Sequence, residues 1–350
     1  MKMSEMSKEN VNILNNRRIL MDYRDLIGKR GSVRAIPAEV FQANLPLFAE
    51  QLSQVDYHFS YSEEQLRKSW KKLCSYKNSD FFTASQTRPG VELCEHFFPN
   101  FFSIKNANGK GFSDYWKPQY LEKVITWNRS SHSTPYLSEL RRGIYFCYGL
   151  TKNTMFRPHL AKMITEHYGA KTVLDPCCGW GGRLLGVVAA GAKYIGFEPN
   201  TETFQHLKEL VSFLQIEDKV ELYCEGAESI PSHGIESEMV LTSPPYYITE
   251  IYCDEASQSV HGKKTYEEWR DRWLWPVIEG ALTTLIPNGA SCWNVAPKMV
   301  DDVAAIHKQN GYGYDKIFGL HSSARQANQN LVHDKKTTDA TICYKNLKIL

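Results

Sequence analysis

The chain has 350 residues, of which 42% are apolar and 23% are charged, and its formal net charge is +2. This composition is typical of an ordinary globular protein. No stretch approaches the roughly 20 apolar residues that a membrane-spanning helix needs, so we expect no transmembrane segment. At about 100–200 residues per domain, the length predicts one large domain and a smaller addition.

Nine cysteines, an odd number without regular spacing, argue against a disulfide framework. The sequence contains no CxxC pair, so we expect no zinc site and no other metal. The first ten residues, MKMSEMSKEN, have no apolar core after their charges, and we therefore expect no signal peptide. Together these features predict a cytoplasmic protein with reduced thiols.

Charge divides the chain near residue 150. Residues 1–150 contain 21 Lys and Arg against 15 Asp and Glu, an excess of +6, whereas residues 151–350 have an excess of −4. A basic half beside an acidic half favours a polyanionic partner for the first half, with ordinary scatter as the alternative. We therefore predict an accessory domain over 1–150 and a larger α/β domain over 151–350.

Two patterns stand out in the first 150 residues. Residues 62–74 have helical periodicity, with an acidic start and a basic end that match a helix dipole. Fifteen aromatic residues lie between Phe81 and Tyr148. Such density predicts a hydrophobic mini-core packed on a neighbouring domain, and the alternative is a set of stacking platforms for nucleic-acid bases.

From Lys171 onward, apolar strand candidates alternate with helical stretches. The candidates are residues 172–177, 194–198, 220–224, 239–242, 290–295, 314–320 and 340–344. This βαβ rhythm predicts a parallel, doubly wound sheet covered on both faces. Only a loop separates the last two segments, so they should pair antiparallel. We expect an α/β fold with a Rossmann-like, mostly parallel sheet of seven strands and a C-terminal antiparallel hairpin.

The segment 173–183, VLDPCCGWGGR, runs from a buried strand into a glycine-rich turn. Open α/β sheets bind ligands beyond the carboxyl ends of their strands, and glycines there let a ligand approach the backbone closely. A phosphate-binding GxxxxGK[ST] loop is absent, and the GxGxxG dinucleotide pattern lacks its third glycine. Asp175 before the glycines favours a positively charged ligand with an amino-acid moiety; capping of the next helix is the alternative role.

The following strand ends also carry candidate ligand-binding residues. Glu198 lies 23 residues after Asp175, about the distance at which such folds place an acid on ribose hydroxyls. Gly226 and Ala227 follow the third strand and would lie beside an adenine ring. After the fourth strand comes Thr-Ser-Pro-Pro-Tyr-Tyr at 242–247, where two prolines cannot continue a central strand and fix the backbone at the ligand edge.

The two motifs together resemble the amino-methylating DNA methyltransferases. The glycine loop after Asp175 is similar to the first motif of that family, and Ser243-Pro244-Pro245-Tyr246 is similar to its fourth motif, [DNS]-P-P-[YFW]. The resemblance covers about residues 150–346, and five parallel strands followed by a hairpin is the strand order of the methyltransferase sheet. It implies S-adenosylmethionine as cofactor and DNA as partner. The cofactor-binding residues that we expect are Asp175, Cys177, Gly179, Gly181, Glu198, Gly226, Ala227, Phe156 and Pro158.

Phe156 and Pro158 belong to the segment 154–160, TMFRPHL. It resembles the family's x-[KR]-P-x-x-L segment, which packs over the methionine end of the cofactor. Leu160 comes one place earlier than in that pattern. Because proline at the first helical position is also good helix-start chemistry, a purely structural role is the alternative.

The resemblance also implies a chemistry for the catalytic motif. The exocyclic amine of cytosine or adenine is a poor nucleophile, because its lone pair is delocalised into the ring. Ser243 and the carbonyl of Pro244 would accept its N–H bonds, and Tyr246 would stack on a base flipped out of the duplex. Serine at the first position is associated with cytosine N4 and Asp or Asn with adenine N6. We therefore expect DNA cytosine-N4 methylation, as in restriction–modification systems, with adenine N6 as the competitor.

Two polar stretches, residues 249–264 and 321–336, are expected to be loops at the ligand edge that contact nucleic acid or are merely solvated. Between them, the tryptophan-containing residues 266–285 should form a helix that covers the sheet. Other functions stay open: RNA-base or glutamine methylation with similar chemistry, a catalytically silent nucleic-acid-binding module, and an oxidoreductase on a similar sheet. The presence of Asp175, Glu198 and Ser243 argues against a catalytically silent module. The missing third glycine argues against an oxidoreductase that binds a dinucleotide.

Overall fold

The computed structural model describes residues 22–78, 80–84, 86–131, 133–150, 153–321 and 337–347. The chain divides into two compact units, of which unit 1 comprises Met1–Tyr57 and Gly111–Lys152, and unit 2 comprises His58–Lys110 and Asn153–Leu350. The units therefore do not coincide with the predicted domains, because residues 58–110 fold with the sheet. Within the described residues, no helix is long and apolar enough to cross a membrane.

Unit 1 is helical. Its helices are α2 (Tyr23–Leu26), α3 (Ser32–Ala35), α4 (Ala38–Ser53), α7 (Phe112–Tyr115), α8 (Pro118–Ser130) and α9 (Leu137–Tyr148). Phe48, Leu121 and Ile144, from the three longest helices, are fully buried. Gly143 lets α9 approach α8 closely, since a Cβ at this position would lie 2.7 Å from Cγ1 of Val124.

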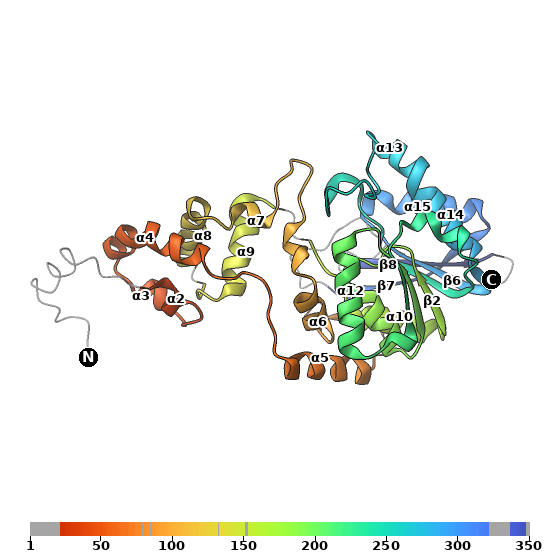
Figure 1. The fold of residues 1–350 in the computed structure, drawn as a ribbon, viewed down its shortest axis with the longest axis horizontal. Helices are drawn as coiled ribbons and strands as arrows, with labels where there is room; N and C mark the ends of the chain where they lie inside the picture. Colours follow the sequence, from red (N-terminus) through yellow and green to blue (C-terminus); the bar gives the residue numbers. More distant parts are fainter. Residues whose placement is uncertain are drawn as a thin grey trace, which may run out of the picture. The chain divides into compact units, whose positions relative to one another are not determined.

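Unit 2 is an α/β unit (Figure 1). Its helices are α5 (Glu63–Ser75), α6 (Val91–Phe97), α10 (Pro158–Tyr168), α11 (Gly182–Ala189), α12 (Thr201–Leu214), α13 (Tyr266–Trp269), α14 (Trp275–Thr283) and α15 (Val300–Gln309). Its strands are β1 (Phe82–Ala84), β2 (Thr172–Asp175), β3 (Lys193–Phe197), β4 (Val220–Tyr223), β5 (Ser237–Thr242), β6 (Leu285–Asn294), β7 (Tyr312–His321) and β8 (Thr337–Asn346).

The strands form one sheet in the order β1-β7-β8-β6-β5-β2-β3-β4. Strands β2 to β6 pair in parallel, and β8 runs antiparallel to both β6 and β7. This order confirms the expected Rossmann-like methyltransferase sheet with its C-terminal hairpin. The eighth strand, β1, comes from the aromatic-rich region and pairs in parallel with β7, an addition that the sequence pattern did not predict.

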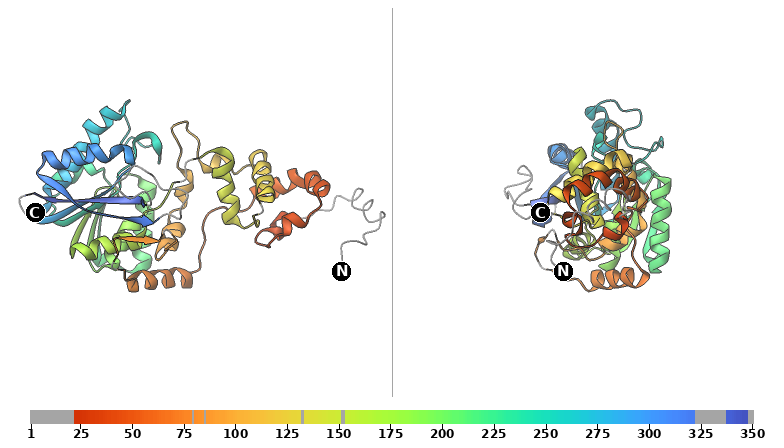
Figure 2. Two further views of the ribbon diagram at one scale, coloured as in Figure 1. Left: turned by 180° about the vertical axis from the view of Figure 1, so that it is seen from behind. Right: turned by 90° about the vertical axis from the view of Figure 1, so that its left-hand side faces the viewer.

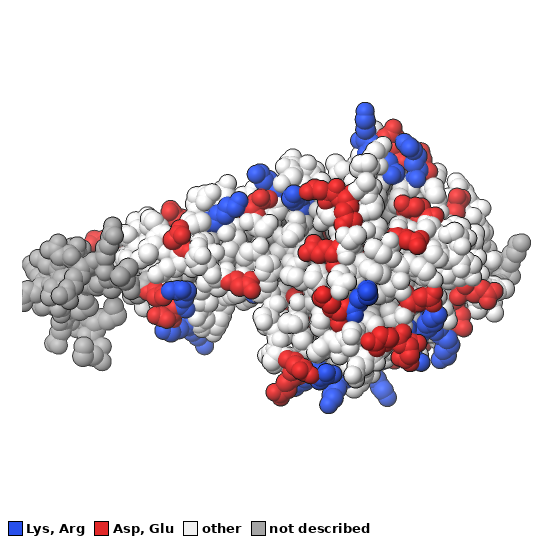
Figure 3. Space-filling view, viewed as in Figure 1, with Lys and Arg blue, Asp and Glu red and all other residues white. Residues whose placement is uncertain are grey.

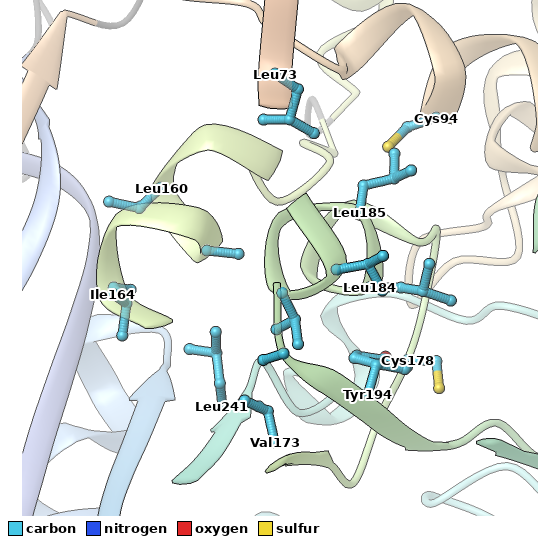
Figure 4. Close-up of a cluster of buried hydrophobic side chains, with 14 of the residues drawn as sticks. Leu73, Cys94, Leu160, Ile164, Val173, Cys178, Leu184, Leu185, Tyr194 and Leu241 are labelled. Atoms are coloured by element: carbon cyan, nitrogen blue, oxygen red, sulfur yellow. The ribbon is translucent and has the colours of Figure 1, made fainter. Parts of the chain in front are cut away.

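Successive residues of the central strands alternate between two hydrophobic cores. Val173 belongs to one core and Leu174 to the other, and Leu241 and Val240 alternate in the same way. Helices α10 and α11 cover the first core, which Figure 4 shows in close-up, and α14 and α15 cover the second (Figures 1 and 2). The predicted helix over 266–285 is confirmed in outline, as α13 and α14 joined by a π-helical turn at Arg270–Leu274.

Residues 58–110 belong to unit 2 because they complete its first core. Leu73 of α5, Leu93 of α6 and Phe98 are fully buried in that core. Helix α5 confirms the predicted helix, and Ser62 caps it in a capping box with Gln65. The burial of Phe98 in unit 2 and of Trp116 in unit 1 agrees with a packing role for the aromatic residues, although Phe146 is 71% exposed.

Basic and acidic side chains intermingle on the face of the molecule that Figure 3 shows. Several of the charged residues form exposed ion pairs, such as Arg67 with Glu63 at 2.7 Å and Lys193 with Glu221 at 2.6 Å. Exposed pairs of this kind contribute little to stability. The polyanionic partner inferred from the excess of basic residues in the first 150 positions therefore stays a prediction. Among the described residues, this face shows no patch of a single charge sign that would support it.

Helices α10 and α11 make an unusually close contact at Gly186. A Cβ at this position would lie 2.2 Å from the carbonyl oxygen of Pro158 and 2.5 Å from Cβ of Ala161. The first clash is with backbone, which cannot be relieved by turning a side chain. Glycine is therefore required here by packing, in the interior of an otherwise apolar helix.

We expect Gly186→Ala to destabilise the protein by about 1–3 kcal/mol, because the added methyl group overpacks the contact between α10 and α11. Chemical denaturation monitored by circular dichroism would measure the loss. Ser212→Ala, at an exposed position of α12, is the control and should change the unfolding free energy by less than about 0.5 kcal/mol. Equal stability of the two variants would contradict the close approach.

Candidate functional site

A pocket lies at the carboxyl ends of the central strands. Its volume is about 1110 Å³, counting the part that is open to solvent. Residues that follow β2, β3, β4 and β5 line it, as does the last residue of β6: Gly179, Glu198, Ala227, Ser243 and Asn294 among them.

Asp175 is buried beneath this pocket and does not line it. Its carboxylate accepts hydrogen bonds of 2.7 Å from Arg183 Nε, Tyr194 Oη and Thr242 Oγ1, and one of 3.2 Å from the backbone N–H of Cys177. The expectation that Asp175 contacts a positively charged ligand is therefore corrected. Its negative charge is already compensated by Arg183, and its hydrogen bonds join the ends of β2 and β5 to Tyr194 near the start of β3.

The cation of this buried pair is Arg183, which is only 4% exposed. Burial works against its charge, but the carboxylate of Asp175 outweighs that effect and raises the pKa of Arg183 above its usual value. Arg183 also donates to the carbonyl oxygens of Cys177 and Cys178, the second at 3.2 Å. The ion pair therefore fixes the backbone of the glycine-rich turn.

The glycines of the turn have different roles. Gly179 lines the pocket with φ +57°, a conformation that favours glycine. Gly181 does not line the pocket: a Cβ there would lie 2.9 Å from Leu210, so this position serves packing against α12. Gly182 does line it, and its Cβ would collide with the carbonyl oxygen of Phe156 at 2.1 Å.

Cys177 lines the pocket as expected, beside this turn. Burial and the nearby Asp175 raise the pKa of its thiol well above the ordinary value. A protonated thiol is a weak nucleophile, so Cys177 is a contact residue and not a candidate for covalent catalysis.

Glu198 lines the pocket and is only 8% exposed. Its carboxylate accepts hydrogen bonds from the backbone N–H groups of Gly179 at 2.9 Å and Asn200 at 3.0 Å. Burial nevertheless raises the pKa of Glu198 to about 7. A buried carboxylate with remaining acceptor capacity is able to bind a ligand that brings hydroxyl donors.

Gly226 and Ala227 also line the pocket, as expected for the residues after β4. Beside them, the carboxylate of Glu228 accepts a hydrogen bond of 3.1 Å from Nε1 of Trp273, and both of these residues line the pocket too. No local sequence signal indicates Trp273 at this position, because its contact with Glu228 joins residues 45 positions apart.

The segment before α10 reaches the pocket through Phe156 but not through Pro158. The ring of Phe156 lies 5.2 Å from the guanidinium carbon of Arg183. Pro158 begins α10 and is buried, and its carbonyl makes the close approach to Gly186. For Pro158 the alternative reading as a helix-start residue therefore fits the structure better than cofactor contact.

Ser243, Pro244, Pro245 and Tyr246 all line the pocket, and a residue absent from the sequence prediction, Asn294 of β6, holds two of them. Asn294 Oδ1 accepts hydrogen bonds from Tyr246 Oη at 2.9 Å and from Ser243 Oγ at 3.3 Å. Its amide nitrogen donates to the carbonyl oxygen of Ala340 in β8 at 3.1 Å. Asn294 is thus held by the hairpin, and Ser243 Oγ also lies 3.2 Å from Tyr246 Oη, where either oxygen is able to donate. The hydroxyl of Tyr246 is therefore hydrogen-bonded to Asn294, whereas the sequence predicted only a stacking role for its ring.

The polar segment after the motif is built against the pocket. Its backbone turns sharply at Tyr247, which has φ +58°, and Ile251 then exchanges two backbone hydrogen bonds with Lys105, of 3.0 and 2.8 Å. Glu250, Tyr252, Ser257, Gln258 and Ser259 line the pocket. The sequence predicted a loop over 249–264 at the ligand edge but not these contacts, because their partners are remote in sequence. The other expected loop, 321–336, lies outside the described residues apart from His321.

Comparisons with known proteins give only distant similarities. No protein-family model matches the chain, and no curated protein matches it. Among solved structures, an rRNA methylase from Streptococcus thermophilus is 16% identical, with a TM-score of 0.37, over 56% of this chain and 99% of that one.

Two further solved structures show the same degree of likeness. A SAM-dependent O-methyltransferase from Thermotoga maritima is 12% identical, with a TM-score of 0.37, over 57% of this chain and 69% of that one. NSun6 from Pyrococcus horikoshii is 11% identical, with a TM-score of 0.41, over 58% and 55%. Similarities this low carry no argument about cofactor or substrate, and the fold assignment rests on the strand order.

Loss of the buried carboxylate should be costly. We expect Asp175→Ala to destabilise the protein by about 3–5 kcal/mol, because it leaves the Arg183 cation buried without a counter-charge. Urea denaturation would measure the change. Glu63→Ala breaks the exposed pair with Arg67 and should cost about 1 kcal/mol or less. If Asp175→Ala proves as stable as this control, the ion pair does not organise the site.

Proposed function

We propose that this protein transfers a methyl group from S-adenosylmethionine to an exocyclic amino group of a nucleic-acid base, with cytosine N4 in DNA as the first candidate. The observation that carries the proposal is one pocket in which the glycine turn, Glu198 and the Ser243–Tyr246 motif face the same space. The two motifs, separated along the chain by α11, β3, α12, β4 and β5, thus face one pocket, which we assign to cofactor and substrate. The serine at position 243 supports cytosine over adenine.

The residues of the pocket fit this cofactor. The Glu198 carboxylate offers acceptors to a ribose diol, and Gly179 allows close approach of the ligand to the backbone. Ala227 and the Glu228–Trp273 pair stand where an adenine would lie, at the end of β4. When bound, the cofactor supplies an electrophilic methyl group on a sulfonium. The part of the chain that holds the methionine end includes Phe156 and Cys177.

The catalytic motif is arranged to accept the N–H bonds of an amine. Ser243 Oγ lies 3.3 Å from Asn294 Oδ1 and 3.2 Å from Tyr246 Oη, so its proton has an acceptor in the pocket wall and a lone pair is left for a hydrogen bond from the substrate. The rigid Pro244-Pro245 pair holds a carbonyl oxygen at the same edge of the sheet. Two fixed acceptors orient the amine and favour the pyramidal geometry that attack requires, so the catalytic contribution is mainly one of orientation and electrostatics. Tyr246 offers its ring to the base.

Unit 1 supplies a candidate contact for the nucleic acid outside the pocket. Phe146 on α9 is 71% exposed and its ring centroid lies 5.3 Å from that of Trp127 on α8. The guanidinium of Arg142 lies 5.5 Å from the Trp127 ring. Aromatic rings beside a cation are typical of surfaces on which unpaired bases stack. This feature favours nucleic acid over a protein substrate.

The pH dependence of cofactor binding should report the state of Glu198. Only the ionised carboxylate accepts two hydroxyl hydrogen bonds, and its pKa is about 7. We therefore expect S-adenosylmethionine affinity, measured by calorimetry, to fall as the pH decreases below 7. Glu198→Gln should lower the affinity at least about tenfold, or 1.4 kcal/mol, at pH 8 and should remove this pH dependence. Unchanged affinity in Glu198→Gln would contradict the assignment of the cofactor site.

The target itself is tested by methyl transfer from labelled cofactor to unmodified DNA and RNA, followed by nucleoside analysis. We expect N4-methylcytosine in DNA. Detection of N6-methyladenine, or of a methylated base in RNA, would assign the activity to that target instead. Ser243→Ala should lower the rate about 10²–10³-fold, the usual cost of one preorganised hydrogen-bonding group, with cofactor affinity unchanged. Ser212→Ala is the matched control. A methylated ring carbon, or full activity in Ser243→Ala, would refute the mechanism.

A further inference from the structure

Methylation of an amine requires a destination for one proton. The nitrogen gains a carbon while still holding both hydrogens, so one N–H bond must break before the product is neutral. Ser243 and the carbonyl of Pro244 accept hydrogen bonds, but neither is a base at neutral pH. If the proposed function is correct, a carboxylate in the pocket is the natural acceptor.

Three carboxylates line the described part of the pocket: Glu198, Glu228 and Glu250. Strand β5, which ends at the catalytic motif, is separated from β3 by β2 and from β4 by two strands. With about 4.8 Å between neighbouring strands, the ends of β3 and β4 lie roughly 10 and 14 Å from the end of β5. Glu198 and Glu228 follow those two strands and are already bonded to backbone amides and to Trp273.

Glu250 lies instead in the segment that follows the Ser243–Tyr246 motif, seven residues after Ser243. Its carboxylate accepts a hydrogen bond from the hydroxyl of Tyr252. The paired hydrogen bonds of Ile251 with Lys105 hold the backbone between these two side chains, and the Tyr252 ring lies 5.7 Å from that of Trp180. Glu250 is therefore fixed within the pocket wall and not carried on a free loop.

We propose that the carboxylate of Glu250 is the general base that removes the proton from the target amine. The amine lone pair forms the new N–C bond while the C–S bond breaks and leaves its electron pair on sulfur. The N–H bond then breaks, its electrons return to the nitrogen, and the proton passes to a carboxylate oxygen of Glu250. Tyr252 keeps that carboxylate turned into the pocket.

The electrostatic surroundings agree with this role. Burial raises the pKa of Glu250 above its ordinary value, although the hydrogen bond from Tyr252 opposes the shift, and a base is more effective as its pKa approaches the working pH. The charged and titratable groups around the pair are Tyr252 on the same segment, Tyr246 after β5 and Glu198 after β3. On the exposed side, Lys105 pairs with Asp254 at 3.8 Å. Because the base acts when ionised, kcat should fall as pH decreases through the pKa of Glu250.

The experiment compares Glu250→Gln with the wild-type enzyme at saturating cofactor and nucleic acid. We expect kcat to fall about 10²-fold or more and its acid limb to disappear, while calorimetric affinity for S-adenosylmethionine and for the oligonucleotide stays the same. Asp254→Asn removes a carboxylate four residues away, outside the pocket, and should leave kcat and its pH profile as in the wild type. Restoration of activity to Glu250→Ala by added formate, without effect on the wild type, would support the assignment.

A Glu250→Gln enzyme with full kcat, or one that keeps the acid limb, overturns the inference. Loss of cofactor affinity in parallel with kcat also overturns it, because that result marks a structural role. These outcomes are distinct from failure of the proposed function. If the wild type methylates neither DNA nor RNA, the proposed function fails. If the wild type methylates a nucleic acid, and Ser243→Ala is inactive while Glu250→Gln is active, only the role of Glu250 fails.

Discussion

The buried ion pair between Asp175 and Arg183 is the interaction on which the rest of the site depends. One carboxylate receives hydrogen bonds from Tyr194 of β3 and Thr242 of β5, so it ties together three neighbouring strands at the edge where the pocket opens. Its partner Arg183 reaches back to carbonyl oxygens of the glycine turn. A buried charge that is paired and fully hydrogen-bonded is tolerated, whereas removal of either partner leaves the other unsolvated. The glycine turn, Tyr194 of β3 and the residue just before Ser243 are therefore positioned together.

The end of the pocket that Ser243 and Tyr246 line has a comparable, uncharged organiser. Asn294 at the end of β6 collects the hydroxyl protons of Ser243 and Tyr246 while its amide group donates to β8. The antiparallel hairpin thus contributes to the site without lining it. A hydroxyl that donates its proton to a neighbour keeps lone pairs with which it can accept a further hydrogen bond.

The division of the chain into units has a simple physical cause. Residues 58–110 supply Leu73, Leu93 and Phe98 to the first core of the sheet, and their bridge at Lys105 holds the segment that carries Glu250 and Tyr252. A stretch that looks like an N-terminal accessory region is therefore part of unit 2, both in its core and in the contacts that hold one wall of the pocket. Unit 1 is left as a smaller helical unit with its own buried residues.

The sequence by itself determined the α/β class, the order of the last seven strands and the two motifs that face each other across the pocket. Period-two burial, glycine-rich turns and paired prolines are local properties, so they can be read from neighbouring residues. Phe156, Gly179, Glu198, Ala227 and Ser243 accordingly line the pocket as expected. Their roles remain proposals, because the pocket's shape alone does not identify a ligand.

Only the tertiary structure decided which polar groups are free to act. The carboxylate of Asp175 is paired with Arg183. Gly181 and Pro158 serve packing. Asn294, Glu228 and Glu250 line the pocket from positions that carry no sequence motif. Each of these outcomes depends on partners tens of residues away in the sequence, such as β8 for Asn294 or Lys105 for the segment of Glu250. A carboxylate in a sequence looks the same whether it binds a ligand or an arginine, and only the completed fold, which brings distant partners within hydrogen-bonding distance, distinguishes the two.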